Sequence, residues 1–132
     1  MRCALTAILL ALSIAAAHAC DPTLPGGTLV ESPRFSLGFR TLPDKIAVGR
    51  HFSVELAVCP KSGTQLPENL RVDAHMPEHR HGMNYKAEVR SAPEGRYRAT
   101  GLMFHMPGRW EFIFDVRAEG KTDRITRSVV LE

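Results

Sequence analysis

After its first nineteen residues, the sequence lacks any apolar run long enough to cross a membrane. We therefore expect no transmembrane segment in the mature chain. Blocks of like charge are also missing: without Arg2, 16 basic residues stand against 14 acidic ones, and they are scattered. So weak a charge excludes a nucleic-acid surface. No Ser-His-Asp or Cys-His arrangement stands out, and Glu78 near the histidines would need a metal and a substrate cleft to act as a base, so we expect no enzyme.

The first nineteen residues have the features of an export signal. Arg2 provides the positive charge, an apolar run follows over residues 4–17, and Ala17-His18-Ala19 is a small-x-small cleavage site. We predict residues 1–19 to be a signal peptide and residues 20–33, rich in proline and glycine, to be an irregular leader. Residues 34–132 are then one domain in a periplasmic or secreted protein.

Cysteine is scarce, and its positions matter. Cys20 and Cys59 remain after the signal is removed, an even number in an exported chain, which favours a disulfide between them. A cysteine directly after the cleavage point is also where bacterial lipoproteins receive their lipid. The alternative is therefore a lipid-anchored envelope protein in which Cys59 is a free thiol.

No convincing helical period appears in the mature chain, whereas apolar and polar residues alternate with a period of two in several segments. Strands are expected at 35–39, 52–58, 70–75, 85–90, 96–100, 110–117 and 122–131. Glycine- and proline-containing turn sequences separate them. This pattern predicts an all-β fold, an immunoglobulin-like antiparallel β-sandwich of about seven strands, with Trp110 in its core.

Histidine and methionine are concentrated in one third of the chain. Four of the five histidines after residue 19, and all four methionines, lie between His75 and Met106, and the tripeptide His-Met-Pro occurs twice. Imidazole and thioether together suit copper better than zinc. Both tripeptides are expected where a strand gives way to a loop, because proline lacks the N–H needed to extend a β-ladder. The candidate copper ligands are His75, His79, His81, His105, Met76, Met83 and Met106.

The segments 73–83, 95–97 and 101–110 resemble the YtkA-like (FixH-related) family of small exported or membrane-tethered β-sandwich domains. The resemblance covers roughly residues 45–131, and its two His-Met-Pro blocks are its most specific part. It implies copper handling and cytochrome oxidase assembly. The chain departs from the membrane-tethered members because no spanning helix follows its signal.

The sequence thus predicts an exported protein that binds Cu(I) or Cu(II) through a His/Met loop cluster and handles or delivers copper in the periplasm. The expected partner is an envelope metalloprotein or a protein that donates or accepts copper. The alternative is a non-metal interaction module of the cell envelope, whose loops contact a partner protein directly.

Overall fold

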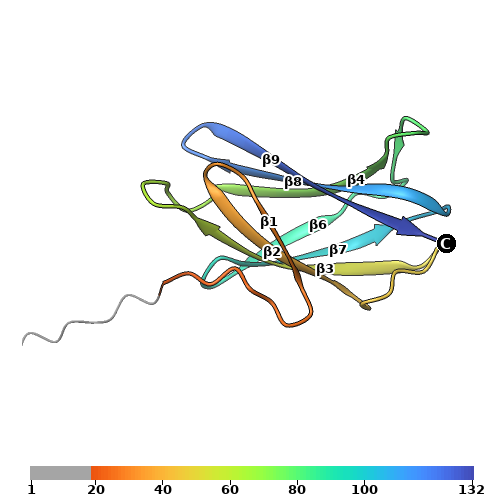
Figure 1. Ribbon diagram of the computed structural model, residues 1–132, viewed down its shortest axis with the longest axis horizontal. Helices are drawn as coiled ribbons and strands as arrows, with labels where there is room; N and C mark the ends of the chain where they lie inside the picture. Colours follow the sequence, from red (N-terminus) through yellow and green to blue (C-terminus); the bar gives the residue numbers. More distant parts are fainter. Residues whose placement is uncertain (1–18) are drawn as a thin grey trace, which may run out of the picture.

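The computed structural model describes residues 19–132, which form a sandwich of two antiparallel sheets (Figure 1). The predicted signal peptide, apart from Ala19, lies outside the described residues. The described part of the chain contains no helix that is long and apolar enough to cross a membrane. The strands are β1 Thr28–Glu31, β2 Phe35–Leu42, β3 His51–Pro60, β4 Asn69–Met76, β5 His81–Gly82, β6 Glu88–Ala92, β7 Arg96–Met103, β8 Gly108–Ala118 and β9 Lys121–Leu131.

One sheet has the strand order β1-β2-β3-β7-β6 and the other the order β5-β4-β8-β9. Without the short strands β1 and β5, this is the arrangement of the immunoglobulin constant domain. There a four-stranded sheet, here β2-β3-β7-β6, faces a three-stranded sheet, here β4-β8-β9. The predicted all-β sandwich is therefore confirmed, although it has nine strands rather than about seven. The two additional strands are the short β1 and β5, and neither is long enough to show a clear alternation in the sequence.

Two boundaries differ from the prediction. The leader is predicted to be irregular throughout, but residues 28–31 form β1, because they pair along the exposed edge of β2. The strand expected at 85–90 is found at 88–92, since its register is fixed by β7, where Glu88 lies opposite Thr100. Pairing partners, rather than local composition, decide both.

The core lies between the sheets and is built from the alternating apolar positions. Phe52, Leu56, Val72, Trp110, Phe112 and Phe114, which the alternation places inside, are all buried, and Phe35 and Phe104 complete the aromatic centre. Phe104 stacks on Trp110 with their ring centroids 4.5 Å apart. Aromatic side chains bury the largest areas available to a small domain, so they dominate its stability.

A disulfide joins Cys20 to Cys59 at the end of β3, with the two Cα atoms 5.6 Å apart. The predicted pairing is confirmed, and in this form the Cys20 sulfur is not available for a lipid. The bond holds the leader on the outer face of the first sheet. There the Pro22 carbonyl lies so close to Gly38 that a Cβ atom at Gly38 would be 1.7 Å from its oxygen.

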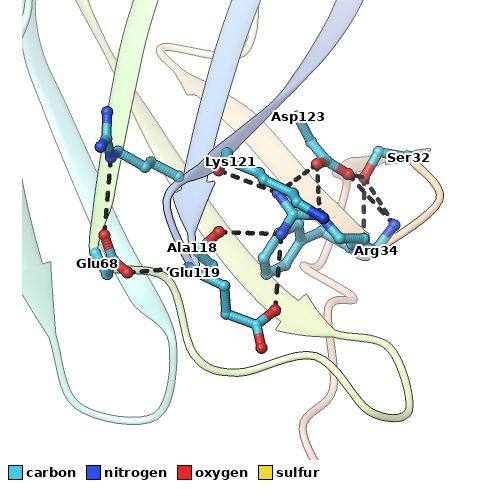
Figure 2. Close-up of polar contacts among 9 residues, drawn as sticks. Ser32, Arg34, Glu68, Ala118, Glu119, Lys121 and Asp123 are labelled. Atoms are coloured by element: carbon cyan, nitrogen blue, oxygen red, sulfur yellow. Dashed lines mark hydrogen bonds and ion pairs between the residues drawn. The ribbon is translucent and has the colours of Figure 1, made fainter.

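The same end of the sandwich is closed by a second set of contacts, centred on Arg34 (Figure 2). Its Nε donates to Asp123 Oδ1 at 2.7 Å and its Nη1 to the Ala118 carbonyl at 3.0 Å. Ser32 Oγ also donates to Asp123, at 2.6 Å. These bonds tie the turn between β1 and β2 to the hairpin of β8 and β9, so the two sheets are held together here by polar contacts as well as by the core.

The outer face of the second sheet carries a network around Asp115, which is nearly buried. Arg124 donates to both of its carboxylate oxygens, at 2.8 and 2.9 Å, and Arg71 donates at 3.1 Å. These hydrogen bonds, the one from Arg124 above all, lower the pKa of Asp115 below its usual value. The network links β4, β8 and β9 across the face opposite the core.

Candidate metal-binding site

Both His-Met-Pro segments come to the same end of the sandwich, opposite the disulfide. Strand β4 ends at Met76 and the neighbouring strand β8 begins at Gly108, so the loops that contain Pro77 and Pro107 lie beside each other (Figure 1, right). Arg109 Nε donates to Glu78 Oε1 at 2.6 Å and joins the two segments directly. This hydrogen bond lowers the pKa of the Glu78 carboxyl. The loops after β4 and before β8 therefore lie next to each other at this end of the sandwich.

Strand parity separates the first histidine from the others. Along β4, Leu70, Val72, Ala74 and Met76 point inward, so His75 points to the outer face. There its Nε2 lies 2.9 Å from Glu111 Oε1 on β8. His75 is therefore near the site in sequence but on the other face of the sheet, and the structure does not bring it to the remaining histidines.

His81 faces the interior instead, because of the hairpin that follows β4. The turn over residues 77–80 places Arg80 in the left-handed region, with φ of 54°, and returns the chain as β5. In β5, His81 lies directly opposite Met76. Residues directly opposite each other in an antiparallel pair share a face, so the His81 side chain lies on the same side of the sheet as the buried Met76.

Three imidazole rings gather at this end. The ring centroids of His81 and His105 are 5.1 Å apart, and those of His79 and His81 are 5.8 Å apart. Three imidazoles that each bind one ion through a nitrogen, at about 2 Å, have their centroids roughly 5 Å apart. His81 thus lies at nearly this spacing from both His105 and His79. We call the three rings of His79, His81 and His105 the imidazole cluster.

Trp110 forms the floor of the imidazole cluster. Its ring meets that of His105 edge to face at 5.3 Å and that of His81 at 6.0 Å. Trp110 is fully buried, and its Nε1 donates to the Met106 carbonyl at 3.0 Å. The sequence indicated only a core role for Trp110. The structure adds that the same ring limits the depth of the cluster and fixes the second His-Met-Pro segment.

His105 has a buried nitrogen without a partner. Its Nδ1 is buried and makes no hydrogen bond, and it is the single side-chain nitrogen or oxygen of this kind among the described residues. Burying such a group without a partner is costly, by about 1–3 kcal/mol. A ligand for this nitrogen would remove the cost.

The methionines differ in how they lie. Met76 is fully buried beneath the cluster, and a Cβ atom at Gly108 would come within 2.8 Å of its Cε. Met83 and Met106 are partly buried and pack against the core. In the first His-Met-Pro segment, Met76 rather than His75 therefore lies on the side of the sheet that carries the cluster.

The cluster is not a closed metal site in this arrangement. Within residues 19–132, no group of three or more His, Cys, Asp or Glu side chains is placed to hold a metal ion. Binding therefore requires rotation of a ring, for which the exposed His79 is free, or a sulfur donor. Met76 lies opposite His81, Met106 follows His105, and Met83 packs against the core; sulfur with imidazole is a donor set for copper.

Two further residues at this end are absent from the predicted ligand set. His51, which is exposed, lies opposite Met103 in the pairing of β3 with β7. The missed signal is the glycine at position 101, which marks a bulge in β7 and changes the face that Met103 occupies.

Among solved structures, a DUF4426 family protein from Pseudomonas aeruginosa PAO1 has a similar fold, with a TM-score of 0.50 and 8% sequence identity. The match covers 81% of this chain and 97% of that chain. At this identity the likeness concerns the fold alone. No family model and no curated protein matches the chain, so the relation to the YtkA-like family stays a prediction.

Proposed function

We propose that the protein is an exported copper-binding protein that holds one copper ion in the imidazole cluster and delivers it to, or receives it from, another envelope protein. The observation that carries the proposal is the meeting of His81 and His105, from two separate segments, beside a buried nitrogen that has no partner. A folded chain gains nothing in stability from such an arrangement, because an unpartnered buried nitrogen destabilises it.

Copper is favoured over zinc because of the sulfur atoms around the cluster. Met76 lies opposite His81 and is fully buried, while Met106 follows His105 directly. Structural and catalytic zinc sites use cysteine, histidine and carboxylate, whereas thioether sulfur suits Cu(I). In this proposal His81 and His105 are the principal ligands, His79 closes the site from solvent, and Met76, Met83 or Met106 supplies sulfur.

The position of the cluster suits transfer of the metal. It lies at an open end of the sandwich, where His79 is exposed and the hairpin turn projects (Figure 1). An ion held there is reachable by ligands of a second protein without opening the core. Sites on loops that a rigid scaffold holds in place are a common arrangement for binding.

Competition with a chromophoric Cu(I) chelator tests the proposal. His81→Ala and His105→Ala should each weaken Cu(I) binding at least about tenfold, or 1.4 kcal/mol. His75→Ala is the matched control, because this histidine is on the outer face and should leave the affinity unchanged. Fluorescence of Trp110, the single tryptophan, should fall on Cu(II) binding, since its ring meets those of His81 and His105.

If the wild-type protein does not compete for copper, the metal proposal fails and the interaction module takes its place. If His75→Ala weakens binding as much as His105→Ala does, the proposed ligand set is wrong. Titration with Zn²⁺ under the same conditions measures the preference for copper. If copper binds no more tightly than zinc, and if Met76→Leu and Met106→Leu leave zinc binding unchanged, sulfur has no role in the site.

A further inference from the structure

His51 and Met103 are a histidine and a methionine that lie at the same end of the sandwich but outside the imidazole cluster. They come from β3 and β7, in the sheet opposite the one that carries His81. With them, all five histidines and all four methionines after residue 19 lie at this one end. The distribution is wider than a single site requires.

A bulge in β7 sets the two side chains opposite each other. Phe52 pairs with Leu102 and Val54 with Ala99, so β7 has one more residue than β3 over this stretch. Gly101, with φ of 82°, takes up the extra residue in a conformation that other residues rarely adopt. A bulge of this kind re-aims the side chains that follow it.

The effect on side-chain direction is definite. Tyr97 and Ala99 face the core, and strict alternation would turn residues 101 and 103 inward as well. Instead, Leu102 and Phe104 are fully buried, so Met103 points to the outer face. His51 precedes the buried Phe52 and points to the same outer face, directly opposite Met103. Side chains in such a pair have their Cβ atoms about 5 Å apart.

Tyr85, from the segment before β6, packs against His51. Its ring meets the His51 ring edge to face, with the centroids 4.9 Å apart. Tyr85 is 46% exposed and His51 is exposed, so the three side chains form a group that solvent and other proteins can reach. One imidazole, one thioether and one aromatic ring are suited to a monovalent soft cation, because nitrogen and sulfur ligate it and an aromatic ring attracts cations.

Only Phe104 separates this group from the imidazole cluster along the chain. Met103 lies before it and His105 after it, which in extended backbone is a separation of about 7 Å. Phe104 itself stacks on Trp110, the floor of the cluster. The two groups of donors are therefore adjacent positions on one rigid aromatic support.

We propose that His51, Met103 and Tyr85 form a second Cu(I) site, weaker and more exposed than the imidazole cluster, through which the ion enters and leaves that cluster. The inference rests on the proposed function and adds the route of exchange. Copper passes from the two donors on the outer face to His105 without any change in oxidation state, by exchange of one ligand for the next.

The test uses protein labelled with ¹³C at the methionine methyl groups and titrated with Ag(I), a diamagnetic monovalent ion with the same ligand preference. The first equivalent should shift methyl signals of the cluster methionines, and the second should shift the signal that is absent in Met103→Leu. In His51→Ala, the first shifts should remain and the second should be lost. In the same two variants, extraction of Cu(I) by excess chelator should be at least about fivefold slower, with unchanged affinity at the first site.

A Met103 signal that does not move while the others do would overturn the inference and leave the proposed function intact. So would unchanged extraction rates in both variants. If no methionine signal shifts and no ion binds, the proposed function fails as well. His75→Ala is the matched control, because this histidine lies on the outer face of the other sheet and should behave as the wild type.

Discussion

Replacing Gly38 by alanine tests how the leader is held on the sandwich. The new Cβ atom would lie 1.7 Å from the Pro22 carbonyl oxygen, whereas carbon and oxygen atoms in contact are normally about 3.3 Å or more apart. Backbone must therefore move by roughly 1.5 Å. Overpacking of this kind costs about 1–3 kcal/mol. The Cys20–Cys59 bond prevents the leader from simply lifting away, so the cost should be near the upper value.

The disulfide supplies the second half of the test. It joins residues 39 positions apart, for which the chain-entropy relation gives a stabilisation of about 4 kcal/mol. In a Cys20→Ser, Cys59→Ser background the leader can detach, so Gly38→Ala should then cost less than about 1 kcal/mol. The two changes should thus be coupled by roughly 2 kcal/mol in a double-mutant cycle.

Urea unfolding of the four proteins in metal-free buffer measures each free energy of unfolding. Gly82→Ala is a control, because a Cβ atom there would lie 3.4 Å from its nearest neighbour, the Ala74 carbonyl oxygen. Equal costs of Gly38→Ala with and without the disulfide would refute the reasoning. They would mean that the disulfide is not what holds the leader against Gly38.

Three further outcomes are expected. Trp110→Ala should lower the free energy of unfolding by about 3–5 kcal/mol, whereas His79→Ala, at an exposed position, should change it by less than about 0.5 kcal/mol in metal-free buffer, as measured by urea unfolding. Asp115→Asn should be less stable than the wild type at neutral pH. Because the folded pKa of Asp115 is lowered, this difference should shrink as the pH falls below about 4 and through the folded pKa, which unfolding curves at several pH values would follow. Arg109→Ala should change stability by less than about 1 kcal/mol, since its ion pair is exposed, yet weaken copper binding several-fold by releasing the turn after β4; an unchanged affinity would show that the ion pair does not position the site.

Much of the fold follows from the sequence because alternation with a period of two reports directly which side chains are buried. The strands around Phe52, Val72 and Phe112 are long and buried on one face, so their pattern is clear. The strands that were missed are short. Two residues of β5 carry no period at all, and β1 is defined by its pairing with β2.

The candidate site was predicted less completely, for a physical reason. Alternation along β4 correctly turns His75 outward, but only the hairpin and the pairing with Met76 turn His81 inward. Similarly, a bulge at Gly101 reverses the parity of β7, so Met103 lies on a face that strict alternation would not assign to it. Distances between residues of different loops depend on such irregularities, and no local pattern encodes them.

The first and the last described residues lie at opposite ends of the sandwich (Figure 1). Cys20 is fixed beside Cys59, whereas Leu131 pairs with Gly108, directly after the second His-Met-Pro segment. Strand β3 runs from His51 to Pro60, so roughly 30 Å separates the disulfide from the histidine end. A purification tag fused after Glu132 would hang over the imidazole cluster, and a polyhistidine tag there would add competing ligands. Immobilisation through the amino-terminal end, by contrast, would present the cluster to solvent and to any partner in solution.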